Sequence, residues 1–143
     1  MIPTASLLEE HGIQFRKKVK RYSRISNSFL DISFKNGIIE QYIIEDNASS
    51  IYRNLLAFEQ SSQTDHENKF TRYVNFMDNL IDTTDDVALL TKRKILGNNL
   101  GSVDEMAKLF NKMCIGLSID SKHHYLVEVY NEINRYCDRP INK

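Results

Sequence analysis

Hydrophobic residues follow two different periods along the chain. From residue 29 to residue 44, Leu30, Ile32 and Phe34 alternate with polar positions, and a second apolar run follows Asn36-Gly37. An Asn-Gly pair tolerates the positive φ angles of a type I′ turn, whose twist matches that of paired strands. The pattern therefore predicts an antiparallel hairpin over 29–44. A lone hairpin is only marginally stable, so a third strand over 13–17 is expected to support it.

Beyond residue 45 the hydrophobic residues recur at helical spacing. The clearest stripe has the i, i+3, i+4, i+7 pattern of a core-facing helix, and it comprises Phe70, Tyr73, Val74, Met77, Leu80 and Ile81. Ser, Thr, Asp and Asn residues at the start of such stretches are typical helix caps. They predict helix starts near Thr4, at Asp46 or Asn47, at Thr83 or Thr84, at Ser102 and near Asp120.

These elements indicate a fold that is α+β but mostly α. We expect a small antiparallel sheet packed against about five helices, in a single domain spanning 1–143. Hydrophobic content of 41% and charged content of 27% are ordinary globular values. The net charge is zero, which argues against a dedicated nucleic-acid binder.

The cysteines and the chain start bear on the compartment. Cys114 and Cys137 both fall in predicted helical stripes, which favours buried thiols over a disulfide and fits a reducing compartment. No apolar run approaches the roughly 20 residues that span a bilayer. The start, MIPTASLLEEHG, carries acids where a signal peptide needs a basic segment. The sequence as given predicts a cytoplasmic chain.

Four acids form the first candidate for chemistry. Asp78 and Asp82 are four residues apart on a predicted helix, so they could share a cation or act as an acid/base pair with Asp85 and Asp86 nearby. Acids at this position are also typical of helix ends, where they stabilise the first turn. The pattern favours this structural role.

Histidines and cysteines form the second candidate. His123 and His124 with Cys114 and Cys137 offer zinc-type ligands, but their spacing matches no compact zinc pattern. Adjacent helical side chains point about 100° apart, so the two histidines would rarely hold one metal ion. Nucleophile, phosphate-loop and dinucleotide motifs are absent, and the chain has only 5 glycines. We therefore predict no catalytic residue, no metal and no cofactor, and interpret the chain as a non-enzyme.

A basic stretch from Arg16 to Arg24 is the remaining candidate, and we predict it to lie in an exposed loop over 16–28. It could bind an anionic membrane surface, where each cation contributes about 1 kcal/mol, or act as a nuclear address. A solvated loop between strands is the plainer interpretation. The residues that would contact a partner or lipid are Arg16, Lys17, Lys18, Lys20 and Arg21.

Six stretches in a fixed order resemble the plant family catalogued as domain of unknown function 247, or uncharacterised protein family 0481. They are distributed along the chain from residue 5 to residue 112. They are residues 5–15 (ASLLEEHGIQF), 30–37 (LDISFKNG), 53–60 (RNLLAFEQ), 77–81 (MDNLI), 86–90 (DVALL) and 109–112 (LFNK). Departures include Ser6-Leu7, His11 and Gln41-Tyr42, where the family usually has other residues.

The resemblance implies a recognition role without catalysis, since members look non-enzymatic and some grass members are linked to pollen-side self-incompatibility. It also implies an unidentified protein partner. The likeness covers the C-terminal part of a longer domain, and family members usually end in a membrane-spanning segment. We therefore expect a truncated or soluble derivative of a plasma-membrane protein. Without the longer domain, the stripe from Phe70 to Ile81 could be exposed and cause self-association.

Overall fold

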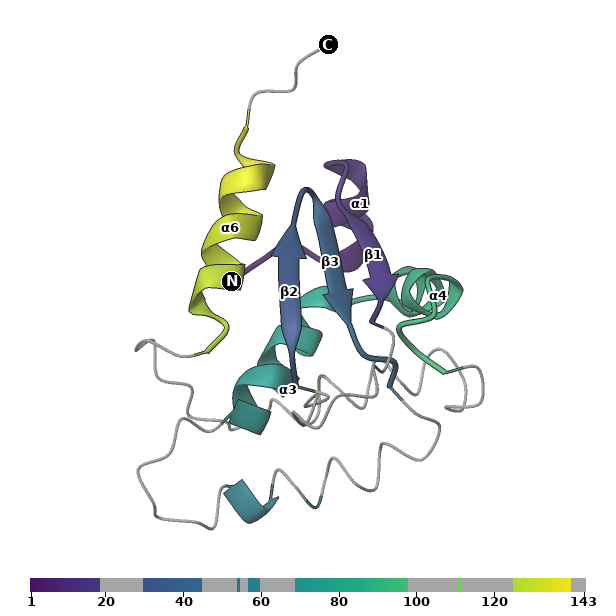
Figure 1. Ribbon diagram of the computed structural model, residues 1–143. Helices are drawn as coiled ribbons and strands as arrows, with labels where there is room; N and C mark the ends of the chain where they lie inside the picture. Colours follow the sequence, from purple (N-terminus) through teal and green to yellow (C-terminus); the bar gives the residue numbers. More distant parts are fainter. Residues whose placement is uncertain are drawn as a thin grey trace.

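A computed structural model describes residues 1–18, 30–44, 54, 57–59, 69–97, 111 and 125–139 of the chain. These residues form a three-stranded sheet with helices along one face (Figure 1). The predicted class, α+β and mostly α, is confirmed. The elements are α1 (Ala5–Glu10), β1 (Gln14–Lys17), β2 (Ile32–Lys35), β3 (Ile38–Gln41), α3 (Lys69–Leu80), α4 (Thr84–Lys92) and α6 (Val127–Cys137).

The sheet has the strand order β1-β3-β2. Asn36 (φ 54°) and Gly37 (φ 77°) both adopt positive φ between β2 and β3, as a type I′ turn requires, and the predicted hairpin is confirmed. The third strand is also present, but β1 pairs with β3 in parallel. The sheet is therefore mixed rather than wholly antiparallel, because β3 lies between the two strands that precede it.

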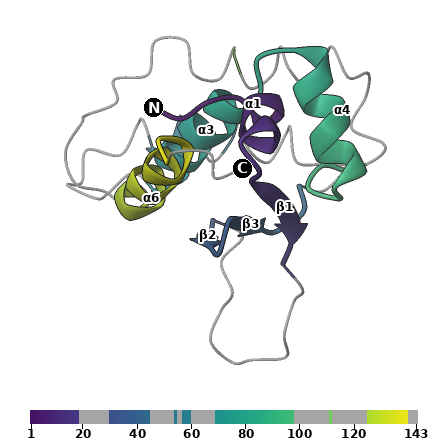
Figure 2. The same cartoon turned by 90° about the horizontal axis from the view of Figure 1, so that it is seen from above.

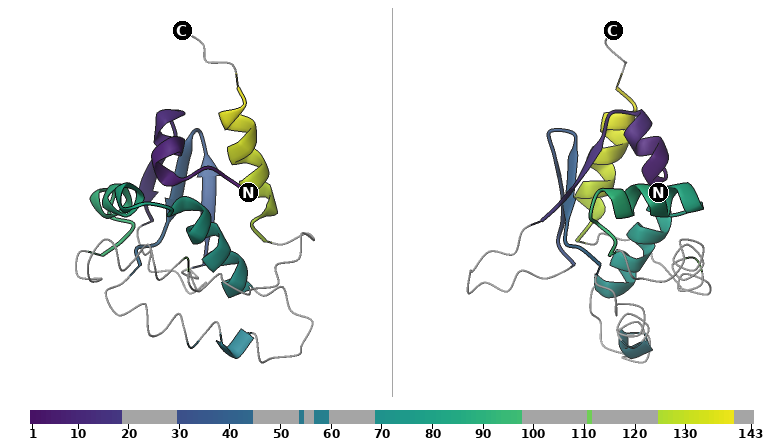
Figure 3. Two further views of the ribbon diagram at one scale, coloured as in Figure 1. Left: turned by 180° about the vertical axis from the view of Figure 1, so that it is seen from behind. Right: turned by 90° about the vertical axis from the view of Figure 1, so that its right-hand side faces the viewer.

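Alternation along the strands gives the sheet one apolar and one polar face. Phe15, Ile39 and Phe34 are aligned across the three strands, and Ile39 is completely buried. The next row places Arg16 and Glu40 on the opposite face. Viewed along the edge of the sheet, the described helices all lie on one side of it (Figure 3). The apolar face of the sheet therefore forms one side of the hydrophobic core.

The helical stripe on α3 fills the centre of that core. Its predicted members are all at most 3% exposed, within this chain alone. The reason for expecting self-association, an exposed stripe, therefore falls away. The largest completely enclosed side chains around it come from every layer and include Tyr73, Phe76, Leu8, Ile13, Ile39, Met77, Leu80 and Leu90.

The remaining contacts place α6 and α4 on opposite sides of the helical layer. Seen from above, α3 and α1 lie between them (Figure 2). Arg93, which follows α4, donates from Nε to Glu9 of α1 at 2.9 Å. α6 packs along the edge strand β2. Two turns far apart in the sequence, the hairpin tip and the end of α6, are thereby brought together.

Helix boundaries agree with the caps in most places. Thr4 caps α1, Gly12 (φ 89°) follows its end, and Thr83 is the N-cap of α4. The last helix was expected to begin near Asp120, whereas α6 begins at Val127. Residues 125 and 126 lie in a turn before the helix, and the Tyr125 hydroxyl donates to the Leu30 carbonyl at 3.0 Å. Most residues of the helices expected after Asp46 and Ser102 lie outside the described residues.

Candidate functional site

Asp86 is the buried member of the acidic group, with 1% of its surface exposed. Its Oδ1 accepts the backbone N–H of Ser6 at 2.9 Å, and its Oδ2 accepts those of Asp82 and Thr83, each at 3.0 Å. Ser6 lies in the first turn of α1 and Thr83 is the cap of α4. One carboxylate therefore supplies acceptors at the start of two helices, where backbone N–H groups have no helical partner.

The pKa of Asp86 reflects these contacts. Burial of the carboxylate acts to raise the pKa, but the hydrogen bonds from Ser6, Asp82 and Thr83 outweigh burial and hold it below the ordinary value. Asp86 is thus kept ionised by bonded donors. A general acid or base would need a pKa near the working pH, so this geometry indicates a structural carboxylate.

Glu59 performs the same task for α3. Its two carboxylate oxygens accept the backbone N–H groups of Phe70 and Thr71, both at 2.8 Å, and the Thr71 hydroxyl at 2.7 Å. These donors occupy the first turn of the helix, where a negative charge is also favoured by the helix dipole. Glu59 thus joins the start of α3 to a residue 11 positions earlier, whereas Asp86 joins the starts of α1 and α4 across 80 residues of sequence.

The other chemical candidates that the structure describes are not assembled into a site. Asp82 and Asp85 are exposed, and the described residues contain no group of three acids, histidines or cysteines that could hold a metal ion. Cys137 is a free, half-buried thiol whose pKa is raised by burial and by Asp138. Cys114, His123 and His124 lie outside the described residues.

The basic stretch is described only at its start. Arg16 and Lys17 are exposed but belong to β1, which corrects the expected loop at these two positions. Lys18 is half-buried, with its Nζ 5.8 Å from the centre of the Tyr42 ring. Lys20 and Arg21 lie outside the described residues. The stretch therefore begins within the edge strand β1, in which the preceding residue, Phe15, is buried in the core.

A groove that the sequence does not suggest lies where the hairpin tip meets the last turn of α6. It is open to solvent and has a volume of about 600 Å³, within the range of ligand sites in proteins. We call it the hairpin groove. Its lining comes from two segments, and comprises Phe34, Lys35, Asn36, Gly37, Glu132, Arg135, Tyr136 and Arg139.

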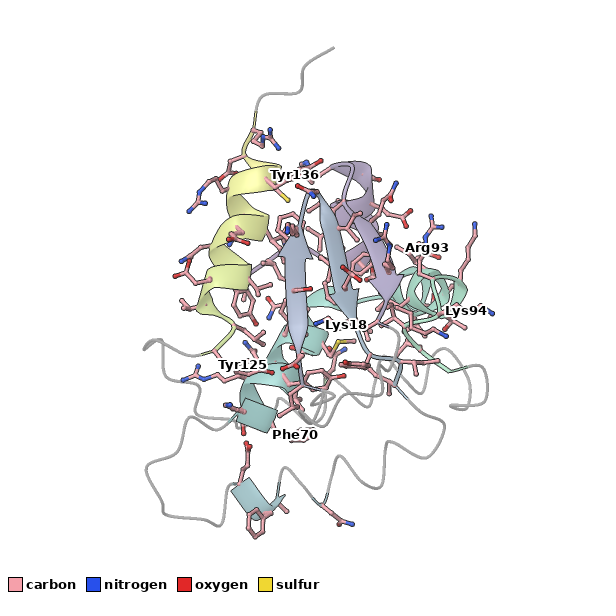
Figure 4. The ribbon with its side chains drawn as sticks, in the orientation of Figure 1. Lys18, Phe70, Arg93, Lys94, Tyr125 and Tyr136 are labelled. Carbon is pink, nitrogen blue, oxygen red and sulfur yellow. The ribbon has the colours of Figure 1, made fainter. Side chains whose placement is uncertain are left out.

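Tyr136 holds the two walls of the hairpin groove together. Its ring meets Phe34 edge-on, with centroids 5.7 Å apart. A Cβ atom added at Gly37 would lie 3.0 Å from the Tyr136 Oη, so the ring needs a residue without a side chain there. The positive φ of Gly37 meets the same requirement. Figure 4 shows Tyr136 at the tip of the hairpin.

Positive charge predominates in the hairpin groove. Lys35, Arg135 and Arg139 are exposed, and Glu132 is the one carboxylate in the lining. The Arg139 guanidinium lies 5.1 Å from the centre of the Tyr136 ring. No ion pair joins these four charged side chains to another residue in the described ranges. Sequence reasoning identified the Asn36-Gly37 turn but had no signal that links it to α6, almost a hundred residues later.

The family model described as "plant protein of unknown function" (DUF247) matches residues 1–143. The chain belongs to this family. Several of the stretches that resemble DUF247 contain residues with a structural role. These residues are Glu59, Asp86, Gly12 and Gly37. Those residues cap helices or form turns. The α6 wall of the hairpin groove lies outside these stretches.

One DUF247 relative is an Arabidopsis thaliana protein assigned to uncharacterised protein family 0481. It is 29% identical over 135 residues, which are 94% of this chain and 25% of the relative. The chain thus spans about a quarter of the length of that protein. No solved structure matches the chain. Among the described residues, no helix is long and apolar enough to cross a membrane.

Proposed function

We propose that this DUF247 chain is a non-enzymatic protein-recognition module and that the hairpin groove is its contact surface. The observation that carries the proposal is the contrast in how charge is used. The carboxylates of the buried Asp86 and the half-buried Glu59 accept hydrogen bonds at helix starts, whereas Arg135, Arg139 and Lys35 line an open groove without ion pairs to described residues. Unpaired cations around an aromatic side chain suit recognition, because Arg and Tyr are enriched where interfaces gain most binding energy.

Capture from plant extract tests this proposal with two charge-matched variants of the full chain. Arg135→Glu with Arg139→Glu reverses the groove, and Lys92→Glu with Lys94→Glu makes the same charge change at and just beyond the end of α4. Lys94 is well separated from Tyr136 in Figure 4. We expect a protein that wild type and the α4 variant capture and the groove variant does not. That protein is then purified and titrated against all three chains.

The titration decides the proposal. Groove-dependent affinity for the purified protein supports it. If every captured protein binds the groove variant as well as it binds wild type, the groove is not the contact surface and the proposal fails. The proposal also states that the chain is not an enzyme. Catalytic turnover of a soluble substrate by the purified chain would contradict that statement if the turnover were lost when a described side chain is changed.

A second candidate function is peripheral binding to anionic membranes through the start of the basic stretch. Arg16 and Lys17 are consecutive exposed cations of the edge strand β1, and this exposure favours it. Sedimentation with vesicles of phosphatidylserine and phosphatidylcholine tests it. Binding should decrease with salt and be lost in Arg16→Glu with Lys17→Glu. Equal sedimentation of this variant and wild type would exclude these two residues as the membrane contact.

A further inference from the structure

We propose that the hairpin groove binds an acidic peptide segment of the partner, and that Arg135 and Arg139 grip its carboxylates. This inference rests on the proposed recognition function and names the chemistry of its ligand. Arg135 lies in the last turn of α6 and Arg139 comes just after the end of that helix, and both side chains line the same groove. A guanidinium presents its N–H donors in a planar fork that fits a carboxylate.

The opposite wall adds a third cation. Lys35 is the last residue of β2 and lines the groove from the hairpin side, facing a wall that carries the two arginines. An extended acidic segment lying along the groove would therefore meet positive charge on both sides. The volume of about 600 Å³ accommodates several peptide groups rather than a single small anion.

The aromatic part of the groove is held in place before any ligand arrives. Tyr136 is fixed by the edge-on contact with Phe34 and by its fit against Gly37. Arg139 lies over the same ring at 5.1 Å. A guanidinium already stacked on an aromatic ring loses less freedom on binding, so the contact surface is preorganised. A side chain next to the ligand's acids can pack against the exposed part of this ring.

Glu132 argues against broad anionic surfaces as the ligand. It is three residues before Arg135 on α6 and lines the same groove, so one part of the lining repels negative charge. A flat anionic membrane would approach the carboxylate together with the cations, whereas a peptide can place its acids beside the arginines alone. The mixture of one acid with three bases thus favours a ligand with a defined sequence of charges.

A structural role for the cations is the competing explanation. Arg135 lies in the last turn of α6, where positive charge interacts favourably with the helix dipole. That role predicts an effect on stability and none on peptide affinity. The test therefore needs a binding measurement, with unfolding monitored separately.

Fluorescence anisotropy of the full chain with a labelled peptide of alternating Glu and Gly provides that measurement. We expect the matching Gln and Gly peptide to bind at least about tenfold more weakly, and affinity for the Glu peptide to decrease as salt is raised. Arg135→Glu with Arg139→Glu should weaken binding at least about tenfold. Lys92→Glu with Lys94→Glu should stay within about twofold of wild type, because exposed charges beyond a Debye length are largely screened.

A conservative variant separates hydrogen bonding by the guanidinium groups from attraction by their net charge. Arg135→Lys with Arg139→Lys keeps the charge and removes both forks, and should weaken binding about three- to tenfold. Circular dichroism melting accompanies every variant. If the double Glu variant is unfolded, Arg135→Gln with Arg139→Gln takes its place, with the same direction of effect.

Several results would overturn the inference. One is equal affinity for the Glu and Gln peptides. Another is an equal loss of peptide affinity in the groove variant and the α4 variant. A third is displacement of the peptide by inorganic phosphate alone at similar concentration. Groove-dependent binding to phosphatidylserine vesicles, with no binding of the peptide, would assign the groove to membranes instead.

If a captured partner needs the groove but the Glu peptide does not bind, this inference fails and the recognition function stands. If the peptide binds but no plant protein needs the groove, the recognition function fails.

Discussion

The start of α4 and the end of α6 use charged side chains in opposite ways. At the start of α4, Asp86 is buried, and its carboxylate accepts hydrogen bonds from the backbone of three residues. At the end of α6, Arg135 and Arg139 are exposed and make no ion pair with described residues. Burial with full hydrogen bonding indicates a structural charge, because an ion removed from water needs compensation. Exposure around a groove leaves the charge available to a ligand.

The structural side of this contrast includes the stretches that resemble DUF247. The stretches that carry the DUF247 resemblance include Glu59 and Asp86, which cap helices, and Gly12 and Gly37, which adopt positive φ. They maintain the fold. The α6 wall of the hairpin groove lies outside them, although the family model also spans it.

The strongest test of the contrast is Asp86→Asn. The amide keeps one oxygen acceptor and places an NH2 group against backbone donors, so buried N–H groups lose their partner. Each such loss costs about 1–3 kcal/mol, and we expect the free energy of unfolding to decrease by about 3 kcal/mol. The matched control is Asp85→Asn, one residue earlier and exposed, which should cost less than about 1 kcal/mol. Urea unfolding measures both. Equal effects would refute the structural role of Asp86.

The pH dependence of unfolding sharpens the same point. The folded-state pKa of Asp86 is lowered, so its contribution is fully present above the unfolded value near 3.8 and is lost as the pH falls through the folded value. The stability difference between wild type and Asp86→Asn should therefore be constant near neutral pH and shrink below about pH 3.8. Other carboxylates cancel in this difference. A gap that persists unchanged to the lowest accessible pH would show that ionisation of Asp86 is unimportant.

The sequence predicted the local elements well and the long-range ones poorly. Alternation around Leu30 and Phe34, with Asn36-Gly37 between the strands, was enough for the hairpin because all of the signal is local. The direction of β1 relative to its neighbour was not predictable in this way. Phe15 would lie on the apolar face whether β1 paired with β2 or with β3. Which of several nearby acids is buried also depends on tertiary contact, and Ser6 is 80 residues from Asp86.

The candidate site illustrates the same limit. The most basic stretch of the sequence drew attention to Arg16 and Lys17, which lie on a strand edge, while the groove arises from separated segments. Arg135 and Arg139 look like ordinary helix-end cations when the sequence is considered alone. Only the packing of Tyr136 against Gly37 shows that they face the hairpin.

Glycine substitutions test whether contacts in the groove contribute to the free energy of unfolding, as the helix caps do. Gly37→Ala introduces a Cβ 3.0 Å from the Tyr136 Oη at a positive φ, and should cost about 2 kcal/mol of unfolding free energy. Gly12→Ala is the control, because its φ is also positive but its Cβ would meet Tyr136 at an ordinary 3.8 Å, so only about 1 kcal/mol is expected.

A double-mutant cycle isolates the role of the ring. In a Tyr136→Leu background, Gly37→Ala should cost about 1 kcal/mol less than in wild type, while the cost of Gly12→Ala should stay nearly constant. Urea unfolding of the single and double variants gives both coupling energies. Equal coupling at the two glycines would mean that Tyr136 does not specifically seal the groove.

The smallest expected effect on stability belongs to the groove cations, and it decides whether the contrast holds. Arg135→Glu with Arg139→Glu removes the stacking of Arg139 on Tyr136 and reverses a favourable helix-end charge, each worth about 0.5–1 kcal/mol at an exposed site. We expect a total loss near 1 kcal/mol, well below that of Asp86→Asn, in urea unfolding under identical conditions. A loss as large as that of Asp86→Asn would make the arginines structural. A small loss accompanied by strongly weakened peptide binding would mean that charge at the end of α6 serves a ligand, whereas charge at the start of α4 serves the fold.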